Sequence, residues 1–168
     1  ASFSPSRTGL VMSLLPLVSL FCGPLSGWIA DRRGAVPVAG AAALFMAAGA
    51  LCFAFSGLSF SLPLTLSGLA LFGLGLGFFF PANVSFVMGR APSGSEGALS
   101  AVLNAAQSTS GAAGVAVFSG IYSARLSSFP QEGAAASLSA FAACGWAGMF
   151  CALAALAFTW ASARRMRV

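Results

Sequence analysis

Five long apolar stretches, almost free of charge, limit what the chain can fold into. They lie at about residues 10–30, 36–55, 62–88, 98–122 and 138–161. Because a helix rises 1.5 Å per residue, each stretch can cross about 30 Å of hydrocarbon, and the third has length to spare. Lipid requires a backbone that satisfies its own hydrogen bonds, and the stretches lack the alternation of barrel strands. We therefore expect an all-α, polytopic transmembrane helix bundle, with five spanning helices in a single membrane domain over residues 1–168.

The composition supports a membrane solvent. Only 7% of the 168 residues are charged and 58% are hydrophobic, whereas soluble domains carry about 25% charged residues. The alternative, a buried fragment of a large soluble protein, would need polar helix faces that the sequence does not provide. The lipid bilayer is therefore the expected first partner.

The arginines predict how the helices are oriented. Six of them fall at helix ends on one side of the expected bundle, namely Arg32, Arg33, Arg90, Arg164, Arg165 and Arg167, against Arg7 and Arg125 on the other. Because the arginine-rich side is cytoplasmic as a rule, the N-terminus is expected outside and the C-terminus inside. Richness in alanine, glycine and arginine suggests a bacterial inner (plasma) membrane. An external start with an odd number of spans, and Ala1 in place of methionine, suggest a fragment of a larger protein.

Several function classes find no support. The basic residues form no stripe with interleaved aromatics, so nucleic-acid binding is not expected. The chain has no histidine, its three acidic residues fall at predicted loops, and its four cysteines form no metal-ligand spacing; the cysteines are expected to pack as small apolar residues. We expect no enzyme activity, no metal and no cofactor.

The stretch "GWIADRRGAV", residues 27–36, concentrates charge where the first span ends. Charge is inexpensive there, whereas at mid-bilayer each charge would cost about 2.5–3.5 kcal/mol. The stretch could act only as a topology anchor. Alternatively, Gly34 and Pro37 tighten a turn of about five residues, and a neighbouring helix N-terminus receives the charge of Asp31.

The third span contains a predicted kink. Gly73 and Gly77 lie four residues apart on one face, so a neighbouring backbone can approach closely, with Gly68 near that face. Pro81 lacks an N–H and clashes with the carbonyl of Gly77, so the helix is expected to bend there. A packing kink and a cavity-lining kink, with Asn83 just beyond it, both remain open.

The fourth span carries a polar face. Asn104, Gln107, Ser108 and Gly111 follow the i, i+3, i+4, i+7 pattern. That face should avoid lipid, either by hydrogen bonding to other helices or by lining a wet transport cavity. Gly111 and Gly114 are expected to allow close packing. Ser93 and Glu96 match a capping box at the start of the helix.

The charged stretch resembles the loop motif of the major facilitator superfamily, G-x-x-x-D-R-x-G-R. Gly27, Asp31, Arg32 and Gly34 match it, whereas Ala35 and Val36 stand where basic residues are expected. The stretches "GLALFGLGLGFFFPANVSF", "GALSAVLNAAQSTSGAAGVAVFSGIY" and "FSPSRTGLVMSLLPL" are similar to the late helices of the fourteen-span drug:proton antiporter branch. The resemblance covers nearly the whole chain and implies helices eight to twelve of the 12-helix core, that is, a partial C-terminal half.

The resemblance implies a function and a site. It makes the chain part of a secondary active transporter, with proton-coupled efflux of small amphipathic drugs or metabolites by alternating access and with the loop motif as a conformational switch. It makes the third span the tenth helix, so that Phe79, Phe80 and Asn83 contact the small-molecule substrate together with Asn104, Gln107 and Ser108. A missing N-terminal half would complete the path and carry the coupling group, since no span here has an ionisable residue away from its ends. A facilitator for a sugar, metabolite or siderophore, and a non-transporting membrane scaffold, are the alternatives.

Overall fold

All the helices expected from the sequence are present. The computed structural model describes residues 5–58, 61–92, 94–128 and 133–165, which form six helices and no strand. The helices are α1 (Pro5–Met12), α2 (Leu14–Arg33), α3 (Ala35–Leu58), α4 (Leu62–Met88), α5 (Glu96–Ser128) and α6 (Gly133–Arg165). The prediction of an all-α helix bundle is confirmed.

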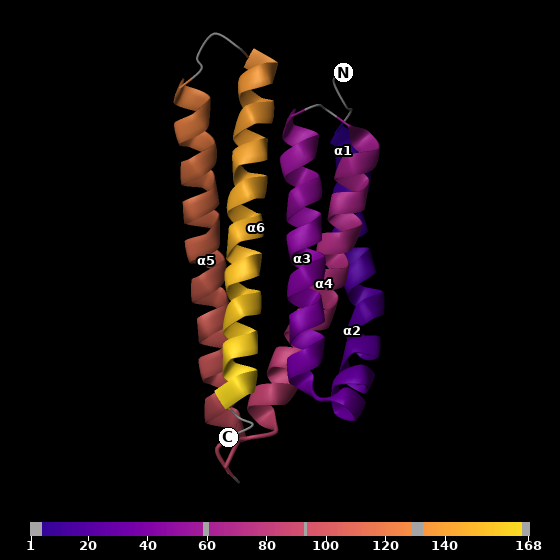
Figure 1. The fold of residues 1–168 in the computed structure, drawn as a ribbon, viewed down its shortest axis with the longest axis vertical. Helices are drawn as coiled ribbons and strands as arrows, with labels where there is room; N and C mark the ends of the chain where they lie inside the picture. Colours follow the sequence, from indigo (N-terminus) through magenta and orange to yellow (C-terminus); the bar gives the residue numbers. More distant parts are fainter. Residues whose placement is uncertain (1–4, 59–60, 93, 129–132, 166–168) are drawn as a thin grey trace.

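Successive long helices run up and down the bundle. In Figure 1, α2, α4 and α6 all end at the lower end, where the C-terminus lies, and α3 and α5 run the other way. Arg33 closes α2, Arg90 follows α4 and α6 ends at Arg165, whereas Arg125 lies in the last turn of α5 at the opposite end. The helix ends that carry most arginines therefore share one end of the bundle; Arg167 lies outside the described residues.

The number of spans differs from the expected five. In the described part of the chain, four helices are long and apolar enough to cross a membrane: Gly9–Arg33, Ala35–Leu58, Leu62–Met88 and Ala135–Ala161. The expected span at 98–122 lies within α5, which is long enough at 33 residues but is not among these four. Its amide and hydroxyl side chains, such as Asn104, Gln107 and Ser108, lower its hydropathy, which explains the difference.

Small residues build the core, which lies where α3 packs along α4 and α6. Its buried apolar residues are mostly alanines, including Ala42, Ala43, Ala47, Ala50 and Ala54 of α3. Helices in lipid associate by close van der Waals packing, because lipid tails are as apolar as the side chains. Alanine and glycine provide that packing by allowing the helix backbones to approach.

The glycines of α4 face two different helices. A Cβ on Gly73 would lie 2.8 Å from the Leu15 carbonyl oxygen, and one on Gly77 would lie 2.9 Å from the Ser19 carbonyl oxygen. The predicted close approach at Gly73 and Gly77 is therefore confirmed, with α2 as the neighbour. Gly68 does not share this face, because its nearest atoms belong to Phe53 of α3.

The turn between α2 and α3 is tighter than expected. The sequence predicted about five residues, but α2 ends at Arg33 and α3 begins at Ala35, so Gly34 is the whole connection. Gly34 has φ 87° and ψ 150°, and its N–H donates to the carbonyl oxygen of Ala30 at 2.9 Å. Pro37 falls within the first turn of α3, where a missing N–H costs nothing.

Candidate functional site

A buried hydroxyl joins α2 to α4 near the predicted kink. Ser26 has no exposed surface, and its hydroxyl donates to the carbonyl oxygen of Phe78 at 2.8 Å. The helix continues through Pro81 to Met88, so the proline does not end it; the kink at Gly77 and Pro81 stays a prediction. Sequence reasoning missed Ser26, although Ser19, Cys22 and Ser26 follow a helical spacing of small residues.

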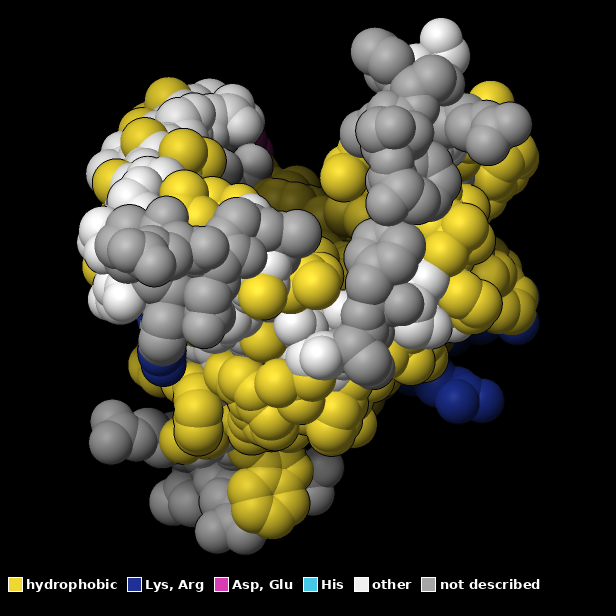
Figure 2. Space-filling view, turned by 90° about the horizontal axis from the view of Figure 1, so that it is seen from above, with side chains coloured by type: hydrophobic (Ala, Val, Ile, Leu, Met, Phe, Trp, Pro, Cys, Tyr) yellow, Lys and Arg dark blue, Asp and Glu magenta, His cyan; other side chains and the backbone are white. Residues whose placement is uncertain are grey.

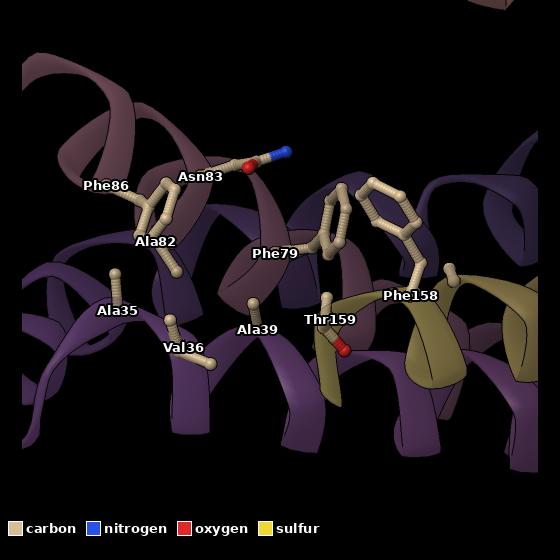
Figure 3. Close-up of a pocket in the computed structure, with 10 residues that line it drawn as sticks. Ala35, Val36, Ala39, Phe79, Ala82, Asn83, Phe86, Phe158 and Thr159 are labelled. Atoms are coloured by element: carbon tan, nitrogen blue, oxygen red, sulfur yellow. The ribbon is translucent and has the colours of Figure 1, made fainter. Parts of the chain in front are cut away.

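A cavity of about 210 Å³ lies between α3, α4 and α6, beside the first turns of α3 and the last turns of α4, and therefore near the end of the bundle that carries most arginines. Its lining consists of Ala35, Val36, Ala39, Phe79, Ala82, Asn83, Phe86, Ala155, Phe158 and Thr159. Figure 3 shows the rings of Phe79 and Phe158 side by side, with the amide of Asn83 on the same side. The cavity thus combines aromatic walls, small residues and one amide, and none of the described residues that line it is charged.

The structure brings together two of the predicted substrate contacts. Phe79 and Asn83 line the cavity, whereas Phe80 does not; it is 44% exposed, with its ring 6.3 Å from that of Phe79. The side chain of Asn83 makes no hydrogen bond with any described residue. An amide in a membrane wall needs a partner, so Asn83 must find it in water, in a ligand or in protein beyond the described residues.

The polar face of α5 lies apart from the cavity. Asn104, Gln107 and Ser108 are all exposed, none lines the cavity, and none of their side chains hydrogen-bonds to a described residue. The prediction of close packing at Gly111 and Gly114 is wrong within the described residues. A Cβ at either position would meet none of their atoms within 4 Å. α5 has no buried residue, and in Figure 2 the molecule is hollowed between the side that carries α5 and the side that carries α1.

Cysteine labelling distinguishes the two explanations of this polar face. In the full-length protein with its other cysteines replaced, Gln107→Cys is expected to react with a membrane-impermeant thiol reagent, because a wet face keeps the thiol hydrated. The control is a second variant that keeps Cys151 as its single cysteine, since Cys151 is exposed on α6 within an apolar run and is expected to face lipid and stay unlabelled. Absence of labelling at position 107 would show that the face is packed against protein.

The loop-motif residues border a shallow depression at the arginine-rich end. Asp31 and Gly34 line it together with Arg90 and the first turn of α3. The guanidinium of Arg32 lies 4.1 Å from the ring centroid of Trp28, a cation–π contact. A Cβ on Gly27 would meet nothing within 4 Å, and Asp31 forms no ion pair with the described residues. Reception of Asp31 by a helix N-terminus stays a prediction.

Glu96 caps the turn before α5. Its carboxylate accepts a hydrogen bond from the Gly94 N–H at 3.1 Å, and α5 begins at Glu96 itself. Ser93, the other residue of the predicted capping box, lies outside the described residues. The four cysteines are free, and the described residues hold no metal-binding group of His, Cys, Asp or Glu.

Comparison with known proteins identifies one informative relative. No protein-family profile matches the chain, and no solved structure matches it. Over 125 residues, or 74% of this chain, the sequence is 30% identical to the riboflavin transporter RibZ of Clostridioides difficile (strain 630). The match spans 27% of that protein, so the chain corresponds to about a quarter of its relative. The chain is thus similar, over most of its own length, to part of a membrane transporter.

Proposed function

We propose that the chain forms part of a secondary active membrane transporter for a small uncharged metabolite or amphipathic compound. Three observations support this: long apolar helices, similarity to a transporter over 74% of the chain, and a cavity wall whose amide has no hydrogen-bond partner among the described residues. The unpartnered amide of Asn83 beside Phe79 carries the proposal. Substrate sites in proteins combine mostly apolar walls with a few placed polar groups, and this cavity has that character.

We further propose which part of a transporter the chain supplies. The chain would supply helices eight to twelve of a major facilitator, in the C-terminal half, with an N-terminal half completing the path and carrying the coupling group. It would sit in a bacterial inner membrane with its C-terminus in the cytoplasm. The grouping of Arg33, Arg90 and the end of α6 at one end of the bundle supports this orientation.

Two classes of substrate, drugs and metabolites, are candidates. Drug:proton antiport follows from the resemblance of the late helices, whereas the similarity to a riboflavin transporter favours carriage of a metabolite. An uncharged cavity lining fits either, because a charged solute would lose hydration there without a compensating partner. Riboflavin is therefore the first compound to test, and export of a panel of amphipathic dyes is the second.

Transport by the full-length protein tests the proposal. In cells that cannot make riboflavin, expression of the full gene is expected to support uptake of radiolabelled riboflavin, and an uncoupler that dissipates the proton gradient is expected to abolish it. Asn83→Leu keeps the branched outline of the side chain but removes the amide. A polar substrate group left without its partner costs about 1–3 kcal/mol, so uptake at low substrate should fall roughly five- to 150-fold.

Two controls interpret this result. Phe150→Leu alters an aromatic side chain that is 65% exposed on α6 and lies outside the cavity, so it should leave uptake unchanged. Uptake that survives the uncoupler would indicate a facilitator. If neither riboflavin uptake nor dye export depends on the gene, the transporter proposal is wrong and a scaffold role would explain the chain better.

A further inference from the structure

We propose that the cavity between α3, α4 and α6 binds one flat, uncharged aromatic ring system whose edge carries hydrogen-bonding groups. This inference rests on the proposed function, because it specifies the chemistry that the same wall would recognise. It concerns binding to named residues, however, so it can be tested without measuring transport.

The size of the cavity sets the size of the ligand. A volume of about 210 Å³ exceeds the roughly 150 Å³ of an apolar cavity that takes up benzene. It is smaller than the roughly 300–1,000 Å³ of pockets that enclose drug-sized molecules. The cavity therefore fits a small fused ring system, and any bulkier substituent must extend through the open side.

The aromatic walls come from two different helices. Phe79 belongs to α4 and Phe158 to α6, and in Figure 3 their rings stand side by side at the cavity. Behind them the lining is small, with Ala39 8% exposed and Ala82 fully buried. Rings at the opening and methyl groups at the floor leave a space that suits a flat ligand, which gains from offset or edge-to-face contacts.

The polar groups of the lining point to a hydrogen-bonding edge. The amide of Asn83 offers both a donor and an acceptor, and it makes no hydrogen bond with the described residues. The hydroxyl proton of Thr159 is already used, because the hydroxyl donates to the carbonyl oxygen of Leu156 at 2.7 Å. In Figure 3 its oxygen points away from the rings. Asn83 is therefore the group that hydrogen-bonds to the edge of the ligand, and an amide or imide edge complements it.

The described lining offers no counter-ion to an ionic ligand. None of the ten described lining residues is charged, and a charged ligand would be desolvated beside them. The described surroundings thus favour an uncharged heterocycle over a carboxylate, a phosphate or an ammonium compound.

Binding to the purified full-length protein tests the inference. The probe is quinazoline-2,4-dione, an uncharged two-ring compound with an imide edge, and saturation-transfer NMR with titration measures its Kd. For a ligand of this size we expect a Kd on the order of 0.1–1 mM. The comparison compound is 1,3-dimethylquinazoline-2,4-dione, which keeps the rings but lacks both N–H donors, and it should bind more weakly.

Matched variants assign the binding to the cavity. Phe158→Leu removes one aromatic wall and should weaken binding roughly two- to tenfold. Asn83→Leu should abolish the difference in Kd between the two compounds, because it removes the amide that hydrogen-bonds to the N–H edge of the ligand. Phe150→Leu lies outside the cavity and should leave the Kd within about twofold of the parent. Each variant is first checked for an unchanged elution volume and helical circular dichroism.

The outcomes separate this inference from the proposed function. Undetectable binding by the correctly folded protein would overturn the inference, and so would equal losses in Phe158→Leu and Phe150→Leu. Retained discrimination between the two compounds in Asn83→Leu would also overturn it. Riboflavin uptake that depends on Asn83 while the probe fails to bind would leave the transporter proposal standing. Probe binding with the expected variant pattern, in a protein that transports nothing, would support the ring site and contradict the transporter proposal.

Discussion

Gly145→Ala is expected to destabilise the bundle by about 1–3 kcal/mol, the usual cost of overpacking a tight core. A Cβ at position 145 would collide with the backbone nitrogen of Ala54 and lie 2.7 Å from its Cα. Ala54 is fully buried in α3, so no flexible side chain can move aside and the two helices must separate. The two helices are also close at a second point, where a Cβ on Gly57 of α3 would lie 2.7 Å from the Cα of Ala142 of α6.

The measurement is the thermal unfolding midpoint of the full-length protein in detergent. Gly148→Ala is the matched control, because it makes the same change one turn along α6, where the nearest atoms would be at 3.5 Å and beyond. Its midpoint should stay equal to or above that of the parent, since alanine favours a helix over glycine. An equal decrease in both variants would mean that the α3–α6 crossing is not as close as the structure has it.

The helices could be predicted from the sequence because the length of an apolar run reports directly on a membrane solvent. The residues at which the helices begin and end were predicted less accurately. α5 and α6 extend past the predicted 98–122 and 138–161 to Glu96–Ser128 and Gly133–Arg165. Hydropathy marks only the apolar middle of a helix, whereas its backbone hydrogen bonds continue into the polar ends.

The pairing of α3 with α6 could not be predicted from the sequence pattern. The contact joins residues such as Ala54 and Gly145, which are far apart in the chain, and a small residue is compatible with many neighbours. Gly73 and Gly77 were identified as a close-approach face, but the sequence did not indicate that α2 is the helix that meets them.

The candidate site shows the same limit. Phe79 and Asn83 were predicted because the family resemblance makes their span the cavity-lining tenth helix, and the structure places both in the lining of the cavity. Phe158 and Thr159 were missed because α6 reaches the cavity only through tertiary packing. Ser26 was missed as well, since one serine in an apolar run does not reveal that it is buried against the Phe78 carbonyl.

Gly34→Ala is expected to destabilise the protein by about 1–3 kcal/mol through backbone strain alone. Gly34 adopts φ 87° and ψ 150°, a region that is essentially restricted to glycine. Steric crowding contributes little, because the nearest atom to a Cβ would be the Pro37 Cδ at 3.9 Å. Since Gly34 alone connects α2 to α3, an alanine must either accept the strain or change the angle between these helices.

Gly27→Ala changes another glycine of the same loop motif, at a position where the backbone does not require glycine. A Cβ at position 27 would meet nothing within 4 Å, and the residue lies inside α2. Alanine should leave the unfolding midpoint unchanged or raise it by up to the equivalent of about 1 kcal/mol. If Gly27→Ala nonetheless reduces transport, Gly27 serves a contact with protein outside the described residues. If Gly34→Ala unfolds at the same midpoint as the parent, the backbone at position 34 does not have the positive φ that the structure shows.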